Sequence, residues 1–273
     1  MFYRICLTFL SILILNSKPL SAFEIKGELA QGGLIIGHVE PGTQIVAGNS
    51  QIGVSPEGDF LVGFGRDAPA KIFLKVTHTS GIQETKTLRI KQRSWKISRV
   101  DGLPGRKVTP KPEDLRRIRA DGAQIKEVRR LRTTISYFNS GFQWPVVGRI
   151  SGVFGSRRIL NGNPRRPHVG IDIAAPLGTP VKAIADGVVV LVHPNMFFTG
   201  KTMMIDHGHG LASVYAHMNK MIVKKGQPVT KGTVIGHIGK TGRATGPHLH
   251  WGISLFSTHL DPQLVVGAMP NKK

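Results

Sequence analysis

Short apolar segments separated by turn residues fill the part of the chain that follows Phe23. They lie at residues 34–36, 44–47, 60–64 and 72–76, and each is bordered by a glycine-containing pair. Strands at a spacing of about 8–12 residues are typical of a small β-sandwich or barrel. We therefore predict a small β-rich, sandwich-like domain over residues 23–100. Its two histidines, His38 and His78, are interpreted as ordinary surface residues.

A segment of helical periodicity follows a glycine- and proline-rich linker at residues 101–109. Pro112 suits a first helical turn, and Glu113 and Asp114 favour its positive end. Apolar residues recur at near-helical spacing at positions 115, 118, 125, 128, 131 and 135. The other face carries lysine and arginine at positions 116, 117, 119, 126, 129, 130 and 132. This face is either an anion-binding surface or a solvated face whose apolar side packs on a neighbouring domain, and we favour the second. Residues 101–140 are assigned to the linker and this basic helix.

From Gly141 the chain becomes β-rich and glycine-punctuated again. Candidate strands lie at residues 180–185, 187–192, 202–205, 211–216 and 233–238, and Asn161-Gly162 and Asp186-Gly187 are tight-turn signals. Strands do not alternate with helices, which argues against a parallel nucleotide-binding sheet. A phosphate-binding Gly-x-x-x-x-Gly-Lys motif is also absent from the sequence. The fold expected is mainly β, with an antiparallel sheet over residues 141–273.

The first 22 residues have the pattern of a secretory signal peptide. Arg4 precedes an apolar run at residues 5–15, and Ser21-Ala22 provides a small-residue cleavage site before Phe23. The run has about half the length that spans a membrane, and an uncleaved short anchor is the alternative. We expect export across the inner membrane to the periplasm or cell envelope, with no stable membrane span after cleavage. The single cysteine, Cys6, lies in this segment, so a metal site in the mature chain must use His, Asp or Glu.

The formal net charge of +21 predicts an anionic partner. Nucleic acid, an anionic lipid surface and an acidic cell-wall polymer all fit such a charge. Residues 141–273 hold 15 Lys and Arg against 4 Asp and Glu, so the excess is divided almost equally between the two parts of the chain. This even distribution, together with export, argues against nucleic acid and favours the cell wall.

Histidines concentrate in the second half of the chain, where carboxylates are scarce. Nine of the eleven histidines follow residue 140, together with only four aspartates and no glutamate. A His-Glu-x-x-His metalloprotease is therefore excluded, and a two-carboxylate glycosidase nearly so. We assign Asp186 to a turn and Asp261, before Pro262, to a loop. Asp172 and Asp206 remain as the candidate chemical carboxylates.

Three short motifs place polar side chains together. His248 and His250 share one face of an extended strand, because alternate side chains point the same way. A strand over residues 168–172 would likewise place His168 and Asp172 on one face, and a third would do so for Tyr215 and His217. The histidine of the His168/Asp172 motif, Asp172 itself and one histidine of the His248/His250 pair would complete a cysteine-free zinc site with an open position for water. The remaining histidines would supply acid–base groups.

In this order, the motifs resemble those of the lysostaphin-type (LytM-like) zinc metallopeptidases over about residues 141–265. The resemblance extends to Gly178-Thr179-Pro180-Val181, Lys225-Gly226-Gln227 and Thr245-Gly246-Pro247-His248. It implies an antiparallel β groove, Zn²⁺ bound by His168, Asp172 and His250, and catalytic roles for His217 and His248. It also implies peptide cross-links of bacterial peptidoglycan as substrate. The order of the residues does not assign the base between the two catalytic histidines.

Other histidines and one loop depart from this pattern. Many relatives carry a tyrosine in the loop that corresponds to residues 195–200, where this chain has Phe197-Phe198. His207-Gly208-His209 is interpreted as a turn, and we expect structural or surface roles for the histidines at positions 193, 237 and 259.

The sequence thus predicts a secreted zinc metalloendopeptidase that hydrolyses stem peptides or cross-links of peptidoglycan. The alternative is a regulator of the same fold that activates a separate cell-wall amidase without cutting any bond. Regulators of that kind usually lack some zinc residues, and none is missing here. The N-terminal domain and basic helix are further expected to be able to hold the groove closed.

Overall fold

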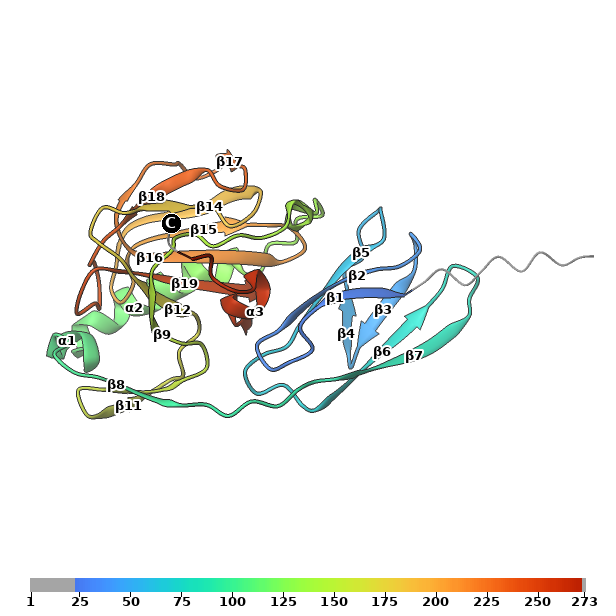
Figure 1. Cartoon of the computed structure of the whole chain (residues 1–273), viewed down its shortest axis with the longest axis horizontal. Helices are drawn as coiled ribbons and strands as arrows, with labels where there is room; N and C mark the ends of the chain where they lie inside the picture. The colour runs from blue at the N-terminus through green and yellow to red at the C-terminus, as the bar shows by residue number, and fades with distance from the viewer. Residues whose placement is uncertain (1–22, 272–273) are drawn as a thin grey trace, which may run out of the picture.

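The computed structural model describes residues 23–271 (Figure 1). The predicted signal peptide lies outside the described residues. Among the described residues, no helix is both long enough and apolar enough to cross a membrane.

Two small antiparallel sheets form the N-terminal part of the protein. The first has the order β1 (Glu24–Gly27), β2 (Leu34–His38) and β5 (Asp59–Gly63). The second has the order β4 (Ser50–Ile52), β3 (Gln44–Ala47), β6 (Lys71–Thr77) and β7 (Gln83–Arg89). The two sheets share one apolar core that includes Ile35, Ile45, Phe60 and Leu74. Small N-terminal β-sheets were predicted, and the structure confirms them.

The two N-terminal histidines differ from each other. His38 is exposed and lies 2.9 Å from the carboxylate of Asp59. His78 is only 7% exposed and lies 3.0 Å from Glu84. The interpretation of His78 as a surface residue is therefore wrong, because its ring is buried at the end of β6 against a paired carboxylate.

A connecting segment runs from β7 across to the far side of the C-terminal sheet (Figure 1). It includes β8 (Ile97–Val100), α1 (Gly105–Val108) and α2 (Pro112–Val128). Strand β8 pairs in parallel with β10 (Arg157–Leu160), which forms a hairpin with β11 (Asn163–Arg165). The hairpin turns at Asn161-Gly162 with φ of 45° and 76°, which is the left-handed backbone that a two-residue turn of this type needs. The turn predicted there is confirmed.

Helix α2 begins at Pro112, as the sequence predicts. It ends at Val128, so Leu131 and Ile135, the last two residues of the predicted apolar face, lie outside the helix. Ile125 and Val128 pack against the strands of the C-terminal sheet, whereas Leu115 is 42% exposed. The expectation that the apolar face of the helix packs on a neighbouring domain is correct only for the C-terminal end of the helix.

The C-terminal part is dominated by one antiparallel sheet with the main order β17-β14-β15-β16-β19-β12-β9, and β13, β18 and β20 pair at its margins. These strands are β9 (Arg149–Gly152), β12 (Ile171–Ala174), β13 (Pro180–Lys182), β14 (Gly187–Met196), β15 (Gly200–Asp206), β16 (Leu211–Met221), β17 (Pro228–Val229), β18 (Val234–Ile238), β19 (His248–Leu255) and β20 (Thr258–Leu260). A 3₁₀ helix, η1 (Tyr137–Ser140), precedes the sheet, and α3 (Pro262–Val266) follows it. The mainly β fold with a large C-terminal antiparallel sheet is confirmed.

The turn expected at Asp186-Gly187 is not a tight hairpin. Gly187 already belongs to β14, and Asp186 accepts a hydrogen bond from the backbone N–H of Lys231. The carboxylate therefore fixes a neighbouring loop instead of closing a two-residue turn.

The N-terminal sheets are joined to the C-terminal sheet by a buried ion pair. Asp261 is 2% exposed, accepts a hydrogen bond from Gln263 N at the start of α3, and lies 2.8 Å from Arg93. Leu34 and Leu61 of the N-terminal strands belong to the same buried cluster as the core of the large sheet. Asp261 thus lies in the short loop expected before Pro262, and its carboxylate there caps α3 and holds a contact between the two parts.

Replacing Arg93 by alanine is expected to lower the free energy of unfolding by about 1–3 kcal/mol, because Asp261 would remain buried without its cation. Urea unfolding of the full mature chain measures this loss. Arg89, an exposed residue of β7, provides the control, and Arg89→Ala should stay within about 0.5 kcal/mol of the wild type. Equal midpoints for the two variants would contradict the role given to the pair.

Candidate metal centre and groove

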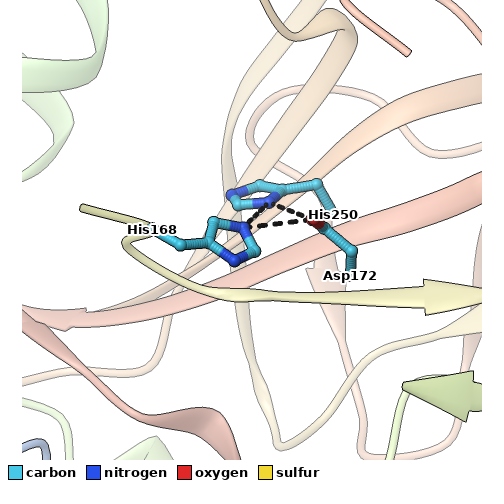
Figure 2. Close-up of side chains that lie close together, drawn as sticks. All are labelled: His168, Asp172 and His250. Carbon is cyan, nitrogen blue, oxygen red and sulfur yellow. Dashed lines mark hydrogen bonds and ion pairs between the residues drawn. The ribbon is translucent and has the colours of Figure 1, made fainter. Parts of the chain in front are cut away.

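Two histidines and one aspartate meet where β12 pairs with β19 (Figure 2). Asp172 and His250 are direct partners in the register of these strands. Asp172 Oδ1 lies 2.8 Å from His250 Nδ1 and 3.1 Å from His168 Nε2. The two ring nitrogens are 3.0 Å apart. The structure thus brings together the three residues that the resemblance implied as metal ligands.

His168 reaches this group from the segment before β12 and not from the strand itself, which begins at Ile171. The expectation of a continuous strand over residues 168–172 is therefore wrong, although the grouping of His168 with Asp172 is right. The backbone N–H of His168 donates to Ser156 O and fixes the segment. A side chain at Gly170 would come within 2.4 Å of the carbonyl oxygen of Trp251, so only glycine allows this crossing of β19.

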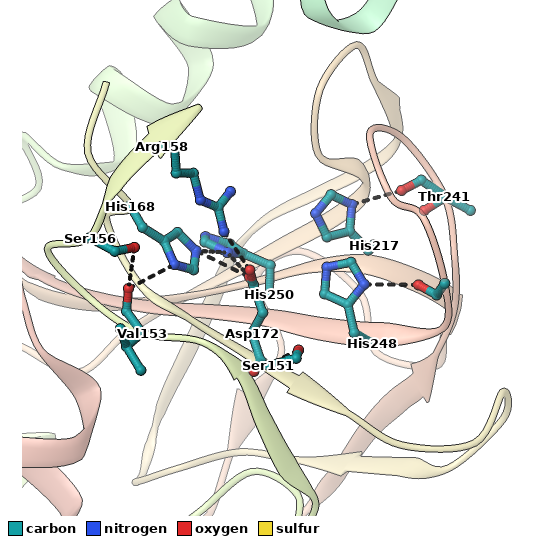
Figure 3. Close-up of polar contacts among 11 residues, drawn as sticks. Ser151, Val153, Ser156, Arg158, His168, Asp172, His217, Thr241, His248 and His250 are labelled. Atoms are coloured by element: carbon teal, nitrogen blue, oxygen red, sulfur yellow. Dashed lines mark hydrogen bonds and ion pairs between the residues drawn. The ribbon is translucent and has the colours of Figure 1, made fainter. Parts of the chain in front are cut away.

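Asp172 is held in its ionised form. Burial alone would raise the pKa of Asp172, but His168 and His250 beside it hold that pKa well below its usual range. The guanidinium of Arg158 pairs with Oδ2 of the same carboxylate, which leaves Oδ1 facing the two histidines (Figure 3). Gly152 makes room for this carboxylate, because a Cβ at that position would lie 2.4 Å from Oδ2.

His168 presents an unprotonated nitrogen to the group. Its Nδ1 donates to the carbonyl oxygen of Val153 at 3.1 Å, since a carbonyl can only accept. Burial lowers the pKa of His168 to about 4 in spite of the opposing effect of Asp172. The ring is therefore neutral near pH 7, with the lone pair of Nε2 turned toward Asp172 Oδ1. Such a backbone partner is the usual means of orienting a metal-ligating histidine.

These donors fit a metal ion. Two imidazole nitrogens and one carboxylate oxygen within 4.8 Å of one another form the three-ligand set of an open catalytic site. Close approach of three such acceptor atoms is favourable when a cation lies among them. The structure and the sequence thus agree on a metal-ligand group of His168, Asp172 and His250.

His217 and His248 lie side by side next to this group (Figure 3). Their ring centroids are 4.7 Å apart, and the ring of His217 is 6.0 Å from that of His250. Nδ1 of His217 donates to Thr241 O at 2.7 Å, and Nδ1 of His248 donates to Gly246 O at 2.9 Å. Nε2 is therefore the nitrogen of each ring that makes no hydrogen bond within the described residues. Burial lowers the pKa of His217 to about 3, with His248 and His250 adding to the effect, so His217 is neutral near pH 7.

The backbone of β16 is irregular at His217, where φ is 60°. This left-handed conformation is rare for a residue other than glycine, and it accompanies a register shift between β16 and β15. Tyr215 points instead into the core, where its hydroxyl accepts from Ile184 N at 3.2 Å. The prediction that Tyr215 and His217 share a strand face is therefore wrong.

A groove extends on both sides of these histidines. On one side lies a pocket of about 1260 Å³, bordered by α2 and lined also by His168, His217 and His250. On the other side lies a pocket of about 400 Å³, lined by residues that include Asp172, His217 and His248. Among residues 23–271, none before Val100 lines either pocket. The walls come from the connecting segment, the β10–β11 hairpin, the large sheet and its loops.

Three of the remaining histidines have defined places. His207 and His209 lie at a turn, and His207 is fully buried with Nε2 2.8 Å from Ser213 Oγ. The interpretation of this motif as a turn is confirmed. His259, expected to be a surface or structural residue, lines the larger pocket beside Arg129, and burial lowers its pKa to about 4.

The second candidate carboxylate, Asp206, lies apart from the metal-ligand group. It accepts hydrogen bonds from Gly208 N and Thr133 Oγ1, which fixes the turn after β15. Phe198, in the loop where many relatives have tyrosine, lines the larger pocket under the guanidinium of Arg243 at 4.7 Å.

Comparison with known proteins gives the same assignment as the motifs. The model of peptidase family M23 matches residues 166–262. A crystal structure described as a peptidase M23 from Pseudomonas aeruginosa is 31% identical, with a TM-score of 0.68, and the alignment covers 89% of this chain and 96% of that one. The chain belongs to peptidase family M23. The match to the P. aeruginosa structure includes the N-terminal sheets as well as the M23 region, and it confirms the resemblance to the lysostaphin type.

Two curated relatives are named for peptidoglycan chemistry. The chain is 47% identical over 106 residues to the peptidoglycan DD-endopeptidase ShyA of Vibrio cholerae, and the alignment covers 38% of this chain and 24% of that protein. It is 41% identical over 125 residues to the DD-carboxypeptidase/endopeptidase Mpg of Neisseria meningitidis, and that alignment covers 46% of this chain and 29% of that protein. The chain thus spans less than a third of the length of these curated relatives.

Proposed function

We propose that this protein is a zinc metalloendopeptidase that hydrolyses peptide bonds of peptidoglycan in the cell envelope. The observation that carries the proposal is the complete set of five side chains around one groove, with three ligand atoms converging on a point and the rings of His217 and His248 side by side next to them. The relatives named as peptidoglycan endopeptidases support the substrate class. The net charge of +21 supports an anionic polymer as partner and does not require nucleic acid.

His168 Nε2, Asp172 Oδ1 and His250 Nδ1 would hold the zinc, which supplies Lewis acidity at the scissile carbonyl. Nδ1 of each ring is held by a backbone carbonyl, so Nε2 is the nitrogen that acts. Nε2 of one ring, that of His217 or His248, accepts a proton from the attacking water and later returns this proton to the leaving amine. The other ring, with a proton from solvent on its Nε2, donates a hydrogen bond to the developing oxyanion. The carbonyls of Thr241 and Gly246 orient the two rings for these transfers.

Digestion of purified sacculi by the mature protein tests the proposal. Mass spectrometry should show loss of cross-linked muropeptides, and a chelator should abolish the loss. His250→Ala should lose zinc and activity, whereas His193→Ala, at a ring outside the metal-ligand group, should keep both. A wild-type protein that binds zinc but leaves sacculi intact, while stimulating a separate amidase, would favour the regulator instead.

Arg158 is expected to act on the metal through Asp172. Arg158→Met should weaken zinc affinity by about 10- to 100-fold, because the carboxylate would lose the partner that holds Oδ2. Competition with a fluorescent chelator measures the affinity. Arg157→Met, at an exposed neighbour on the same strand, is the matched control. Unchanged affinity in Arg158→Met would show that the ion pair does not orient the ligand.

We also propose the division into a signal peptide at 1–22, a β-rich domain at 23–100, a linker with the basic helix at 101–140 and a metallopeptidase domain at 141–273. The separate core of β1–β7 supports the second unit. N-terminal sequencing of the exported protein, with Phe23 expected as the first residue, tests the signal peptide. Closure of the groove by the N-terminal domain stays a prediction, although the groove walls begin only at Val100.

A further inference from the structure

The larger pocket is strongly cationic. Within the part of the chain that the structure describes, eight lysine and arginine side chains line it, and no aspartate or glutamate does. Several of these cations have partners of their own. Arg158 is paired with Asp172, Arg130 lies 3.8 Å from Glu127, and Arg165 donates to Val108 O. Their charges are therefore balanced or anchored within the chain.

Arg129 differs from these neighbours. It follows α2 directly, and its side chain is turned into the pocket. Its Nη1 donates to Nε2 of His259 at 3.4 Å, and its Nε is buried without a hydrogen-bond partner among the described residues. Burial lowers the pKa of Arg129, and no carboxylate opposes this effect. Arg129 is half-buried, and a partly desolvated guanidinium without a counter-charge is unfavourable unless a ligand supplies one.

The surroundings of Arg129 suit a carboxylate. The guanidinium of Arg132 lies over the ring of Phe256 at 5.0 Å, and both of these residues line the same pocket. Arginine binds carboxylates through parallel N–H donors, and an apolar ring at the side shields such a contact from water. The pocket is also lined by His168, His217 and His250, so a ligand at Arg129 and a scissile bond at the metal-ligand group occupy one continuous groove.

We propose that Arg129, together with Arg132 in the lining of the same pocket, forms a subsite that binds a free carboxylate of the peptide substrate and selects acidic peptides over amidated ones. This inference rests on the proposed endopeptidase function and adds a specificity-determining residue outside the five-residue set. It assigns an anion-binding role to two arginines of the basic segment, Arg129 and Arg132.

A matched set of peptides tests the subsite. Each carboxylate of a cross-linked peptide is replaced in turn by a carboxamide, and kcat and KM are measured for the zinc-loaded full mature chain. For one position, the carboxylate peptide should be preferred by about 10- to 100-fold in kcat/KM, mainly through KM. Arg129→Met should reduce this preference to within about threefold, and Arg129→Lys should retain part of it. Arg130→Met removes one charge from the same pocket and should leave the preference unchanged.

Binding in the presence of a chelator separates this inference from the proposed function, because no bond is cut under that condition. Calorimetry should show tighter binding of the carboxylate peptide to the wild type and equal binding of both peptides to Arg129→Met. A wild type that cleaves neither peptide but discriminates between them in binding would overturn the activity and keep the subsite. Equal binding of the two peptides by the wild type would overturn the subsite. If inorganic phosphate displaces both peptides and the protein does not discriminate between them, the peptide carboxylate is not the ligand of the Arg129 subsite.

Discussion

Asp172→Ala is expected to lose its zinc and to reduce peptide hydrolysis by at least about 1,000-fold. Oδ1 of Asp172 lies within 3.1 Å of a ring nitrogen of both ligand histidines. Its removal leaves the two imidazoles without the anionic ligand. Lewis-acid catalysis by a metal contributes several kcal/mol to lowering the barrier, and each 1.36 kcal/mol corresponds to a tenfold change in rate. The substitution also leaves Arg158 without its carboxylate, which further opposes a dication at this place.

The measurement combines metal content by mass spectrometry with turnover of cross-linked muropeptides. Asp186→Ala is the matched control, because Asp186 lies outside the metal-ligand group, directly before β14, and its carboxylate fixes the loop at Lys231. Circular dichroism must show that both variants are folded. An Asp172→Ala protein that retains one zinc per chain and wild-type turnover would contradict the ligand assignment.

The metal-ligand group was accessible from the sequence because its parts are local. His248 and His250 are two residues apart on one strand, and alternation alone places them on one face. The partnership of Asp172 with His250 needs the register of β12 against β19, which the resemblance supplied and no local pattern encodes. The group could therefore be predicted as a set, although the backbone that carries His168 was predicted wrongly.

The position of His217 shows where the pattern fails. Alternation assigns Tyr215 and His217 to one face, but the irregular backbone at His217 moves that side chain away from the face of Tyr215. A positive φ at a residue other than glycine depends on tertiary contacts, here the hydrogen bonds from His217 to the 199 and 241 carbonyls. Sequence periodicity carries no signal for such a bulge.

The residues that orient the site were missed for a similar reason. Arg158 reaches Asp172 only because β10 pairs in parallel with β8, about 60 residues earlier in the chain. The two arginines at the start of β10 hide the strand from an apolar pattern. The partners of the rings of His168 and His217 are backbone carbonyls, which every residue possesses and which therefore leave no mark in a sequence.

His217→Ala is expected to lower kcat by about 100- to 10,000-fold while the zinc content stays at that of the wild type. His217 lies outside the three-donor group, but its ring is 4.7 Å from that of His248 and its free Nε2 is available to the reacting water. The effect should fall on kcat much more than on KM, because proton transfer occurs only in the transition state. Steady-state kinetics on a defined cross-linked peptide, with metal analysis of the same sample, measures both quantities.

His248 provides the comparison that separates general-base catalysis from stabilisation of the oxyanion. Glutamine at either position keeps a hydrogen-bond donor but cannot take up a proton. The base should therefore lose as much activity in the glutamine variant as in the alanine variant, whereas the oxyanion donor should be partly rescued by glutamine. If the two rings act as one unit, the double alanine variant should be little worse than the more severe single variant. Full rescue by glutamine at both positions would leave neither histidine as the base and would overturn the proton-transfer role given to this pair.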